Sequence, residues 1–488
     1  MTNPTEEALH RAVGPALPDE ELHLERVLGP VQLILLGIGA VIGAGIFVIT
    51  GTAAAEHAGP AVLISFVIAG FGCLFAGLCY AEFASLIPES GSAYTYSYAT
   101  MGRLMAWFIG WNLVLEYLMS GAAVAAGWSG YFQALLADVG VHIPAALGNA
   151  PLTFDAAHNI VTTGALINLP AAGLVAFLTA LLVVGARESA TFNGAMVILK
   201  VAVVLAVIGF CLPYVKLENL TPFIPANTGT YGHYGWSGIA SGAGMVFFAY
   251  IGFDAVSVAA NETRNPQRDL PIGILGSLAV CTVLYMLMAL VMTGVVSYTK
   301  LDVPNPVSFA VAQIGPQLGW LVPLVNIGAT LGLATVVFVS IYGQSRIFYS
   351  MARDGFLPPA FSRVHPRFRT PYRGTIITGA LAAIFGGLFP LDILGDLVSI
   401  GTLLAFVVVC AGILILRVRA PKARRPFRTP YVWVVAPLGI AVCGYMMYSL
   451  SNDTWARLVV WTLIGMVIFF SYGIRHAQRS KWTVLNEE

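Results

Sequence analysis

Charged residues are scarce in this sequence, and their scarcity excludes a soluble globular fold. Only 10% of the 488 residues are charged, 58% are hydrophobic, and the mean hydropathy is +0.80. A soluble domain carries about 25% charged residues. Because this chain cannot cover a water-facing surface with so little charge, the composition indicates a membrane protein with many spanning helices.

The positions of the histidines and cysteines argue against a metal site and against a histidine proton relay within the spans. None of the eight histidines lies in the middle of an expected span, which argues against a histidine metal site or proton relay there. The six cysteines lie in apolar runs without CxxC spacing, which is typical of buried helix packing. We therefore expect no metal, no cofactor and no catalytic residues.

Long apolar runs predict twelve spanning helices, since a bilayer core needs about 20 apolar residues per helix. The least regular connection, 138–166, has a mixed composition that is compatible with a short surface helix. The predicted spans are 31–55, 60–86, 104–137, 166–186, 190–214, 236–260, 272–297, 317–350, 374–389, 393–417, 431–450 and 456–475.

The arginines and lysines are concentrated in alternate connections between the spans, and this distribution predicts the orientation of the chain. With the N-terminus inside, most of them fall in cytoplasmic connections, and only Lys216, Lys300 and Arg457 fall outside. Lys200 is left within a span. The sequence therefore predicts a multi-pass protein of the cell membrane with both termini cytoplasmic, including tails at 1–30 and 476–488.

Two spans carry glycines that weaken a helix in its middle. The first reads "GIGAVIGAGIFVITG", from Gly37 to Gly51, and the sixth reads "FFAYIGFDA", from Phe247 to Ala255. Glycine costs a helix about 1 kcal/mol relative to alanine. Gly39 and Gly43 also form a GxxxG packing motif. However, two interrupted helices in corresponding halves are the best sequence sign of a transporter site, so we expect both spans to be broken.

Broken helices free backbone groups that can hold a zwitterion. Half-helix N-termini offer N–H groups to a carboxylate, and freed carbonyls accept from an ammonium group. An amino acid fits this arrangement without any charged side chain. In lipid, such irregular backbone is tolerated only where it lines a cavity or is buried in protein.

Three ionisable residues, Glu116, Lys200 and Asp254, lie deep in apolar spans. A charge at the centre of a helix costs roughly 2.5–3.5 kcal/mol to insert, so each one needs a reason. Asp254 is predicted as the N-cap of the second half-helix of span six. Lys200 is a candidate proton carrier, with a snorkelling packing role as the alternative. Glu116 is a candidate proton-coupling residue, and its position is also compatible with a conformational or ion-pair role or with a substrate ligand.

Four long motifs make the chain resemble the amino acid–polyamine–organocation superfamily of permeases, and most closely its cationic amino acid transporter subfamily with bacterial proton-coupled members. The resemblance extends over about 25–475. The motifs are "GIGAVIGAGIFVITG", "CYAEFASLIPESGSAYTYSYATMGRLMAWFIGWNLVLEY" (79–117), "FFAYIGFDAVSVAANETRNPQRDLPIGI" (247–274) and "YGQSRIFYSMARDGFLP" (342–358).

The resemblance implies an all-α LeuT-like fold with two inverted repeats. The first repeat would be 31–214 (helices 1–5) and the second 236–417 (helices 6–10), with helices 11–12 at 431–475. Helices 1 and 6 would be discontinuous. Alternating access would come from rocking of helices 1, 2, 6 and 7 against 3, 4, 8 and 9, and the segment 305–316 would form an outer lid.

The resemblance also implies the residues of the binding site. The substrate carboxylate would lie at the helix 1 break, and the ammonium near the carbonyls of the helix 6 break. Lys200 matches a helix 5 lysine whose amine would bridge helices 1 and 8 when charged. Glu116 matches an acidic residue of helix 3. The implied substrate-binding residues are Val41, Ile42, Gly43, Ala44, Gly45, Phe248, Ala249, Ile251 and Leu333.

Two residues depart from the pattern of the resembled family, and they determine which substrate we expect. Ala44 stands where relatives often have Ser or Thr, and Leu333 is a bulky apolar residue in the helix 8 stretch that faces the substrate. We therefore expect a proton-coupled transporter of neutral L-amino acids such as alanine. The alternatives are an exchanger or a cationic amino acid or polyamine permease using the same site. The expected partners are the substrate and membrane lipid, with a small single-span accessory subunit left open and no nucleic acid.

Overall fold

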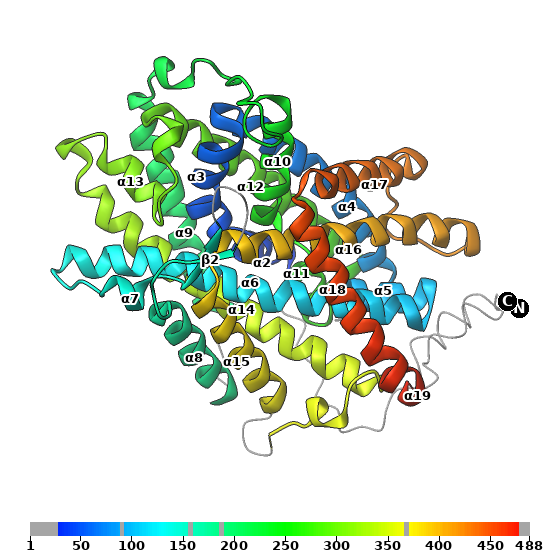
Figure 1. Ribbon diagram of the computed structural model, residues 1–488. Coiled ribbons are helices and arrows are strands. Elements are labelled where there is room, and N and C mark those ends of the chain that lie inside the picture. Colours follow the sequence, from blue (N-terminus) through cyan, green and yellow to red (C-terminus); the bar gives the residue numbers. More distant parts are fainter. Residues whose placement is uncertain (1–27, 88–91, 155–159, 185–189, 366–369, 478–488) are drawn as a thin grey trace, which may run out of the picture.

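The computed structural model describes residues 28–87, 92–154, 160–184, 190–365 and 370–477, and these are almost all helical (Figure 1). Most of the two predicted tails lies outside these ranges. Arg187, Arg367 and Arg369, three of the cations in the predicted cytoplasmic connections, lie outside them as well. The cytoplasmic position of both termini therefore stays a prediction.

The first half of the chain contains predicted spans one to five. The first span is split between α2 and a second segment of mixed helical type, and the others correspond to α4, α6, α8 and α9. The bounds are α2 (Pro30–Val41), η1 (Gly45–Ile49), α3 (Thr50–Thr52), η2 (Ala53–Ala58), η3 (Gly59–Ala61), α4 (Val62–Leu86), α5 (Ser92–Met101), α6 (Arg103–Asp138), α8 (Leu169–Val184), α9 (Ala190–Cys211), η4 (Leu212–Tyr214) and η5 (Leu217–Leu220).

The second half contains predicted spans six to twelve. Span six is divided between α10 and α11, and the remaining spans are α12, α14, α15, α16, α17 and α18. The bounds are α10 (Gly235–Val246), η6 (Phe247–Tyr250), α11 (Ala255–Val258), η7 (Ala259–Glu262), α12 (Pro266–Val295), η8 (Tyr298–Lys300), α13 (Pro306–Ala312), η9 (Pro316–Leu318), α14 (Leu321–Arg353), η10 (Pro359–Ser362), α15 (Tyr372–Leu388), α16 (Leu391–Arg419), α17 (Val432–Ser449), α18 (Asn452–Ile468), η11 (Phe469–Gly473) and α19 (Ile474–His476).

The lengths of these helices suit a membrane. Among the described residues, nine helices are long and apolar enough to cross a bilayer, with Gly45–Leu86 taken as one helix. Three shorter apolar helices, Pro30–Val41, Leu169–Val184 and Tyr372–Leu388, fall on predicted spans one, four and nine. Every predicted span therefore corresponds to helical structure, and the protein is an all-α polytopic membrane protein, as the sequence predicts.

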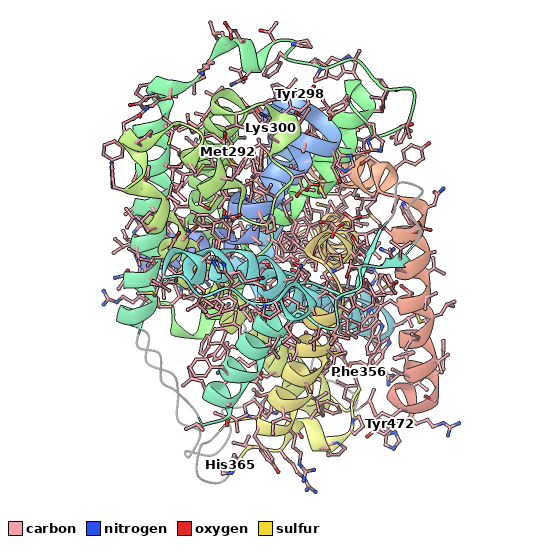
Figure 2. The ribbon with its side chains drawn as sticks, turned by 60° about the vertical axis from the view of Figure 1, so that its left-hand side comes forward. Met292, Tyr298, Lys300, Phe356, His365 and Tyr472 are labelled. Atoms are coloured by element: carbon pink, nitrogen blue, oxygen red, sulfur yellow. The ribbon has the colours of Figure 1, made fainter. Side chains whose placement is uncertain are left out.

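The irregular connection after α6 contains little regular structure. It holds the short helix α7 (Ala145–Gly148), which the sequence left open, and a small antiparallel pair, β1 (Leu152–Phe154) and β2 (Ile160–Thr162). Figure 2 places Lys300 at one end of the molecule and His365 at the opposite end. This separation agrees with the opposite sides predicted for their two connections.

The helices pack in two groups, and α14 of the second group contacts α2 of the first. In one group α12 packs against α2 and α4, and α10 also packs against α4. In the other, α6, which crosses the centre of Figure 1, packs against α14, and α15 packs against α8. α16 contacts α6, α4 and α17. The two groups are helices 1, 2, 6 and 7 and helices 3, 4, 8 and 9 of the predicted spans.

Small residues let these helices approach closely. A Cβ added at Gly39 would lie 2.6 Å from Val197 of α9, and one at Gly37 would lie 2.5 Å from the hydroxyl of Ser277 on α12. Gly37 and Gly39 therefore let α2 pack closely on its neighbours, and for Gly39 this agrees with the packing alternative of the GxxxG motif. The six cysteines are free and buried, as their apolar surroundings predicted: Cys73, Cys79, Cys211, Cys281, Cys410 and Cys443.

One buried ion-pair network fixes the connection between α16 and α17. The Glu82 carboxylate at the end of α4 lies 2.7 Å from the Arg417 guanidinium and 3.0 Å from that of Arg425, and its side chain is fully buried. The backbone N–H of Thr429 also donates to Glu82 (2.8 Å). A buried charge is tolerated when it is paired in this way.

Candidate functional site

The first span is interrupted where the sequence predicts a break. The helix α2 ends at Val41, Ile42 has an extended conformation (φ −71°, ψ 99°), and helical structure resumes as a π-helix at Gly45. A helix start leaves its first N–H groups without an intrahelical acceptor. The backbone around Gly43, Ala44 and Gly45 therefore presents donors at the break, which suit a carboxylate.

The sixth span is interrupted as well. After α10 the chain forms a short 3-10 turn, and Ile251 then adopts an extended conformation (φ −62°, ψ 135°). Gly252 has φ 114°, a left-handed conformation that L side chains rarely adopt. The second half-helix begins after Asp254. Both predicted breaks are therefore confirmed.

The two breaks lie against each other. A Cβ added at Gly45 would lie 2.3 Å from the Cα of Ala249, and one at Gly252 would lie 2.9 Å from the carbonyl oxygen of Ala40. The Tyr285 hydroxyl of α12 lies 2.9 Å from the Val41 carbonyl and 2.6 Å from that of Ala249. Tyr285 thus contacts both breaks at once, which the sequence analysis missed.

Lys200 binds the end of the first half-helix. Its side chain is fully buried, and its amine donates to the carbonyls of Gly39 and Ile42 (2.9 Å for Ile42). These carbonyls belong to the last turn and cap of α2, where a helix leaves acceptors unpaired and the dipole favours a cation. The methylene stem of Lys200 packs on Gly332 of α14, 3.2 Å from a Cβ built there.

This geometry refines the role predicted for Lys200. The resemblance implied a charged amine bridging helices 1 and 8. In the structure the amine donates hydrogen bonds to α2, which is part of helix 1. The aliphatic part of the side chain packs against α14, which is helix 8. The bridge therefore consists of a polar contact on one side and an apolar contact on the other.

Asp254 lies at the N-cap position of α11, but its carboxylate makes no capping hydrogen bond. The predicted cap is wrong in this respect. One carboxylate oxygen instead accepts from the hydroxyls of Ser92 and Tyr117, each at 3.3 Å, and the side chain is buried. A residue in helical conformation at this position cannot turn its side chain back onto the first N–H groups, because capping requires extended backbone.

A small cavity of about 30 Å³ lies beside the breaks. It is lined by Ala40, Ile251 and Gly252 of the broken spans, by Glu116, Tyr117 and Ser120 of α6, and by Val336, Val339 and Ser340 of α14, with Ala255 also present. Its volume suits about one water molecule, so an amino acid needs the surrounding helices to move. Of the three ionisable residues predicted deep in the spans, Glu116 is the one that lines this cavity.

Leu333 does not line this cavity, although it is fully buried. Val336 of α14 lies against the first break, since its side chain would lie 3.3 Å from a Cβ built at Gly43. Val336 is one helical turn beyond Leu333. Of the two residues, Val336 is therefore the one that the structure places at the site.

Several predicted acceptors already have protein partners. The Phe248 carbonyl accepts from the Ile251 N–H (3.2 Å), and the Ala249 carbonyl accepts from Tyr285. Each carbonyl oxygen has two lone pairs and can accept a second donor. The carbonyls of Val41 and Ile42 accept from Tyr285 and Lys200. The hydrogen bonds from Tyr285 and Lys200 therefore stabilise the conformation of the first break.

The segment predicted as an outer lid covers the second half-helix of span one. It forms α13, which contacts η1. Tyr131 of α6 joins the two, because its hydroxyl donates to the Phe47 carbonyl (2.6 Å) and accepts from the Val307 N–H (3.3 Å). Among the described residues no group of three or more His, Cys, Asp or Glu is placed to hold a metal ion.

Comparisons with known proteins show which sequences this chain resembles. A family model described as "Amino acid permease" matches residues 28–471. A "Methylthioribose transporter" from Bacillus subtilis is 46% identical over 94% of this chain and 95% of its own length. A "Branched-chain amino acid permease BcaP" from the same organism is 47% identical, with the same coverage. A "Cationic amino acid transporter 3, mitochondrial" from Arabidopsis thaliana is 39% identical over 81% of this chain and 63% of its own length.

Proposed function

Because the chain belongs to the amino acid permease family, we propose that it is a secondary active transporter of neutral L-amino acids, coupled to protons. The family is one of transporters and not of enzymes. The chain is a multi-pass membrane protein, and we place it in the cell membrane with both termini cytoplasmic. Nothing in the comparisons supports an accessory subunit, and the proposal includes none.

The substrate contacts follow from the two breaks. In our proposal the carboxylate takes the N–H groups at Gly43, Ala44 and Gly45, where a helix begins. The ammonium group takes free lone pairs on the carbonyls of the sixth span, at Phe248, Ala249 and Ile251. This arrangement uses main-chain dipoles alone, so it leaves the side chain of the substrate to set specificity.

The observation that carries proton coupling is the position of Lys200. A fully buried amine that holds the carbonyls of Gly39 and Ile42 changes its bonding when it loses a proton, because it then carries no charge and one donor fewer. The cytoplasmic half of span one would then be held less tightly. In our proposal this release permits rocking of the group formed by α2, α4, α10 and α12.

Apolar side chains around the cavity favour a neutral substrate. Val336 and Val339 of α14 and Ile251 of span six line it. The relative named as a branched-chain amino acid permease supports the same class. The relative named as a methylthioribose transporter is equally similar, so this compound belongs in any competition assay.

One observation favours a second candidate, a cationic amino acid. Glu116 lines the same cavity, and a carboxylate there could pair with the side chain of lysine or arginine. More distant relatives carry the name of cationic transporters. Strong inhibition of alanine uptake by arginine would favour this candidate, and inhibition confined to neutral amino acids would favour the first.

The test uses purified protein in liposomes without internal amino acid. An inward proton gradient is expected to drive accumulation of labelled alanine by the wild type. Lys200→Ala is expected to fold, as judged by size-exclusion chromatography, but to lose gradient-driven accumulation. If Lys200→Ala accumulates alanine as well as the wild type, the proton role is wrong. If the wild type needs internal amino acid before any uptake occurs, the protein is an exchanger.

A further inference from the structure

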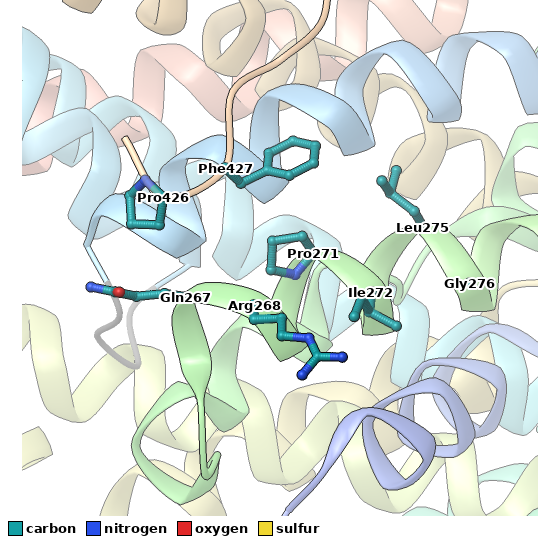
Figure 3. Close-up of a pocket in the computed structure, with 8 residues that line it drawn as sticks. All are labelled: Gln267, Arg268, Pro271, Ile272, Leu275, Gly276, Pro426 and Phe427. Atoms are coloured by element: carbon teal, nitrogen blue, oxygen red, sulfur yellow. The ribbon is translucent and has the colours of Figure 1, made fainter. Parts of the chain in front are cut away.

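A second cavity, of about 730 Å³, lies at the N-terminal end of α12, away from the two breaks. Figure 3 shows Arg268, Pro271, Ile272 and Leu275 of α12 on one side, facing Pro426 and Phe427 of the connection before α17. Most of these side chains are apolar, and a single cation stands at the end of the row. We call this cavity the α12 groove.

The α12 groove continues into the face of α12 that the protein leaves uncovered. Ile272 is 38% exposed, and Val280 and Val283 are 41% and 54% exposed further along the helix. These positions recur at helical spacing on one face. In a membrane-spanning helix an exposed apolar face contacts lipid tails, so the groove opens where the lipid-facing surface ends.

The polar end of the groove is positively charged. Arg268 is exposed, and the two ion pairs formed among the described residues both involve Glu82 rather than Arg268. Its neighbour Asp269 is buried and does not line the groove. The N-terminus of α12, a 30-residue helix, adds the positive end of its dipole.

The opposite wall of the groove is rigid. The N–H of Phe427 donates to the hydroxyl of Ser85 (3.3 Å), and the N–H of Thr429 donates to Glu82 (2.8 Å). The buried network of Glu82 therefore holds this wall against α4. A site needs such a fixed wall, because a mobile one would lose entropy when a ligand binds.

We propose that the α12 groove binds one anionic phospholipid. Its phosphate contacts the Arg268 guanidinium, which matches phosphate oxygens in a bidentate geometry. One acyl chain lies along Ile272 and Leu275 and continues onto the exposed face of α12. The lipid joins α12 to the connection between α16 and α17, so it favours the arrangement described here and slows any change that separates them.

The test compares Arg268→Gln with a matched control, Arg264→Gln. Arg264 is an exposed arginine just before α12 that does not line the groove. Binding of phosphatidylglycerol to protein in detergent is measured by native mass spectrometry and by the shift of the melting temperature, with phosphatidylcholine as the neutral reference. Arg268→Gln is expected to bind phosphatidylglycerol about five-fold more weakly, as one surface cation implies, while Arg264→Gln matches the wild type.

A third variant tests the apolar part of the groove. Leu275→Trp fills it and leaves Arg268 in place, so it is expected to lose phosphatidylglycerol binding as well. Equal binding by all variants would overturn the proposal. So would an equal shift of the wild type with inorganic phosphate at the same concentration, because the site would then hold a free anion. Melting temperatures without lipid show whether each variant has folded, and these readouts do not depend on the transported substrate.

Discussion

The contact between the two breaks can be tested with one added methyl group. In Gly45→Ala the new Cβ would lie 2.3 Å from the Cα of Ala249, in the backbone of the opposite break. Carbon atoms need about 3.5 Å, so the two segments must separate by about 1.2 Å. A backbone neighbour cannot rotate away. We therefore expect a loss of stability of about 3 kcal/mol, the upper end for overpacking.

Gly43→Ala provides the matched control. It adds the same methyl group two residues earlier, but its nearest neighbour is a methyl of Val336 at 3.3 Å. A shift of a few tenths of an ångström in a side chain relieves that contact. We expect a change of about 1 kcal/mol or less, with the backbone N–H groups of the break kept.

The assay measures the melting temperature of both variants in detergent and their alanine uptake in liposomes. Gly45→Ala is expected to melt at a lower temperature and to transport less, because the proposed substrate donors at the first break move away from the proposed acceptors at the second. Gly43→Ala is expected to remain near the wild type in stability. Equal behaviour of the two variants would refute the reasoning, since it would mean that the breaks do not touch.

Three further predictions concern other regions. Glu82→Gln leaves two arginines without their counterion and is expected to lower stability by about 3–5 kcal/mol in a melting experiment; an unchanged melting temperature would contradict the buried network. Val336→Ala is expected to enlarge the cavity and let larger neutral amino acids compete better with alanine, whereas Leu333→Ala is not. Burial raises the pKa of Asp354, so the folded protein holds this proton more tightly than the unfolded chain. The stability from this bound proton is present below about pH 4 and is lost as the pH rises through the pKa of Asp354 in the folded protein. Asp354→Asn should therefore make the melting temperature less dependent on pH over that range. An unaltered pH dependence would argue against a raised pKa of Asp354.

The sequence was most informative where a residue type conflicted with its surroundings. Gly43 and Gly252 lie in apolar spans that would be stronger without them, and both breaks follow from that conflict. Lys200 stood out for the same reason, because a buried cation needs acceptors. Broken backbone is the nearest source of free carbonyls. The twelve spans followed from the required length of apolar helix alone.

The sequence was less informative about which face of an apolar helix meets the site. In α14 both Leu333 and Val336 are apolar and buried, so no pattern distinguishes the one that lines the cavity. Tyr285 was missed because a tyrosine in a span has many possible partners, and only the packing of α12 shows which it takes. Asp254 was assigned by position, but its bonds to distant hydroxyls depend on tertiary structure.

The first break is held by two tethers of different kinds, and this difference predicts how they combine. Lys200 donates to carbonyls at the end of α2 and, in our proposal, loses its charge during transport, whereas the uncharged hydroxyl of Tyr285 joins the same turn to the sixth span. Because both act on one turn of backbone, Lys200→Met and Tyr285→Phe should couple by about 0.5 kcal/mol or more in a double-mutant cycle on stability. If the hydrogen bonds of Lys200 weaken on deprotonation while those of Tyr285 persist, α2 could rotate about the turn at Val41 while the two breaks stay in contact. Strictly additive effects would show that the two side chains hold independent parts of the backbone, and protonation of Lys200 could then not move α2 relative to the substrate.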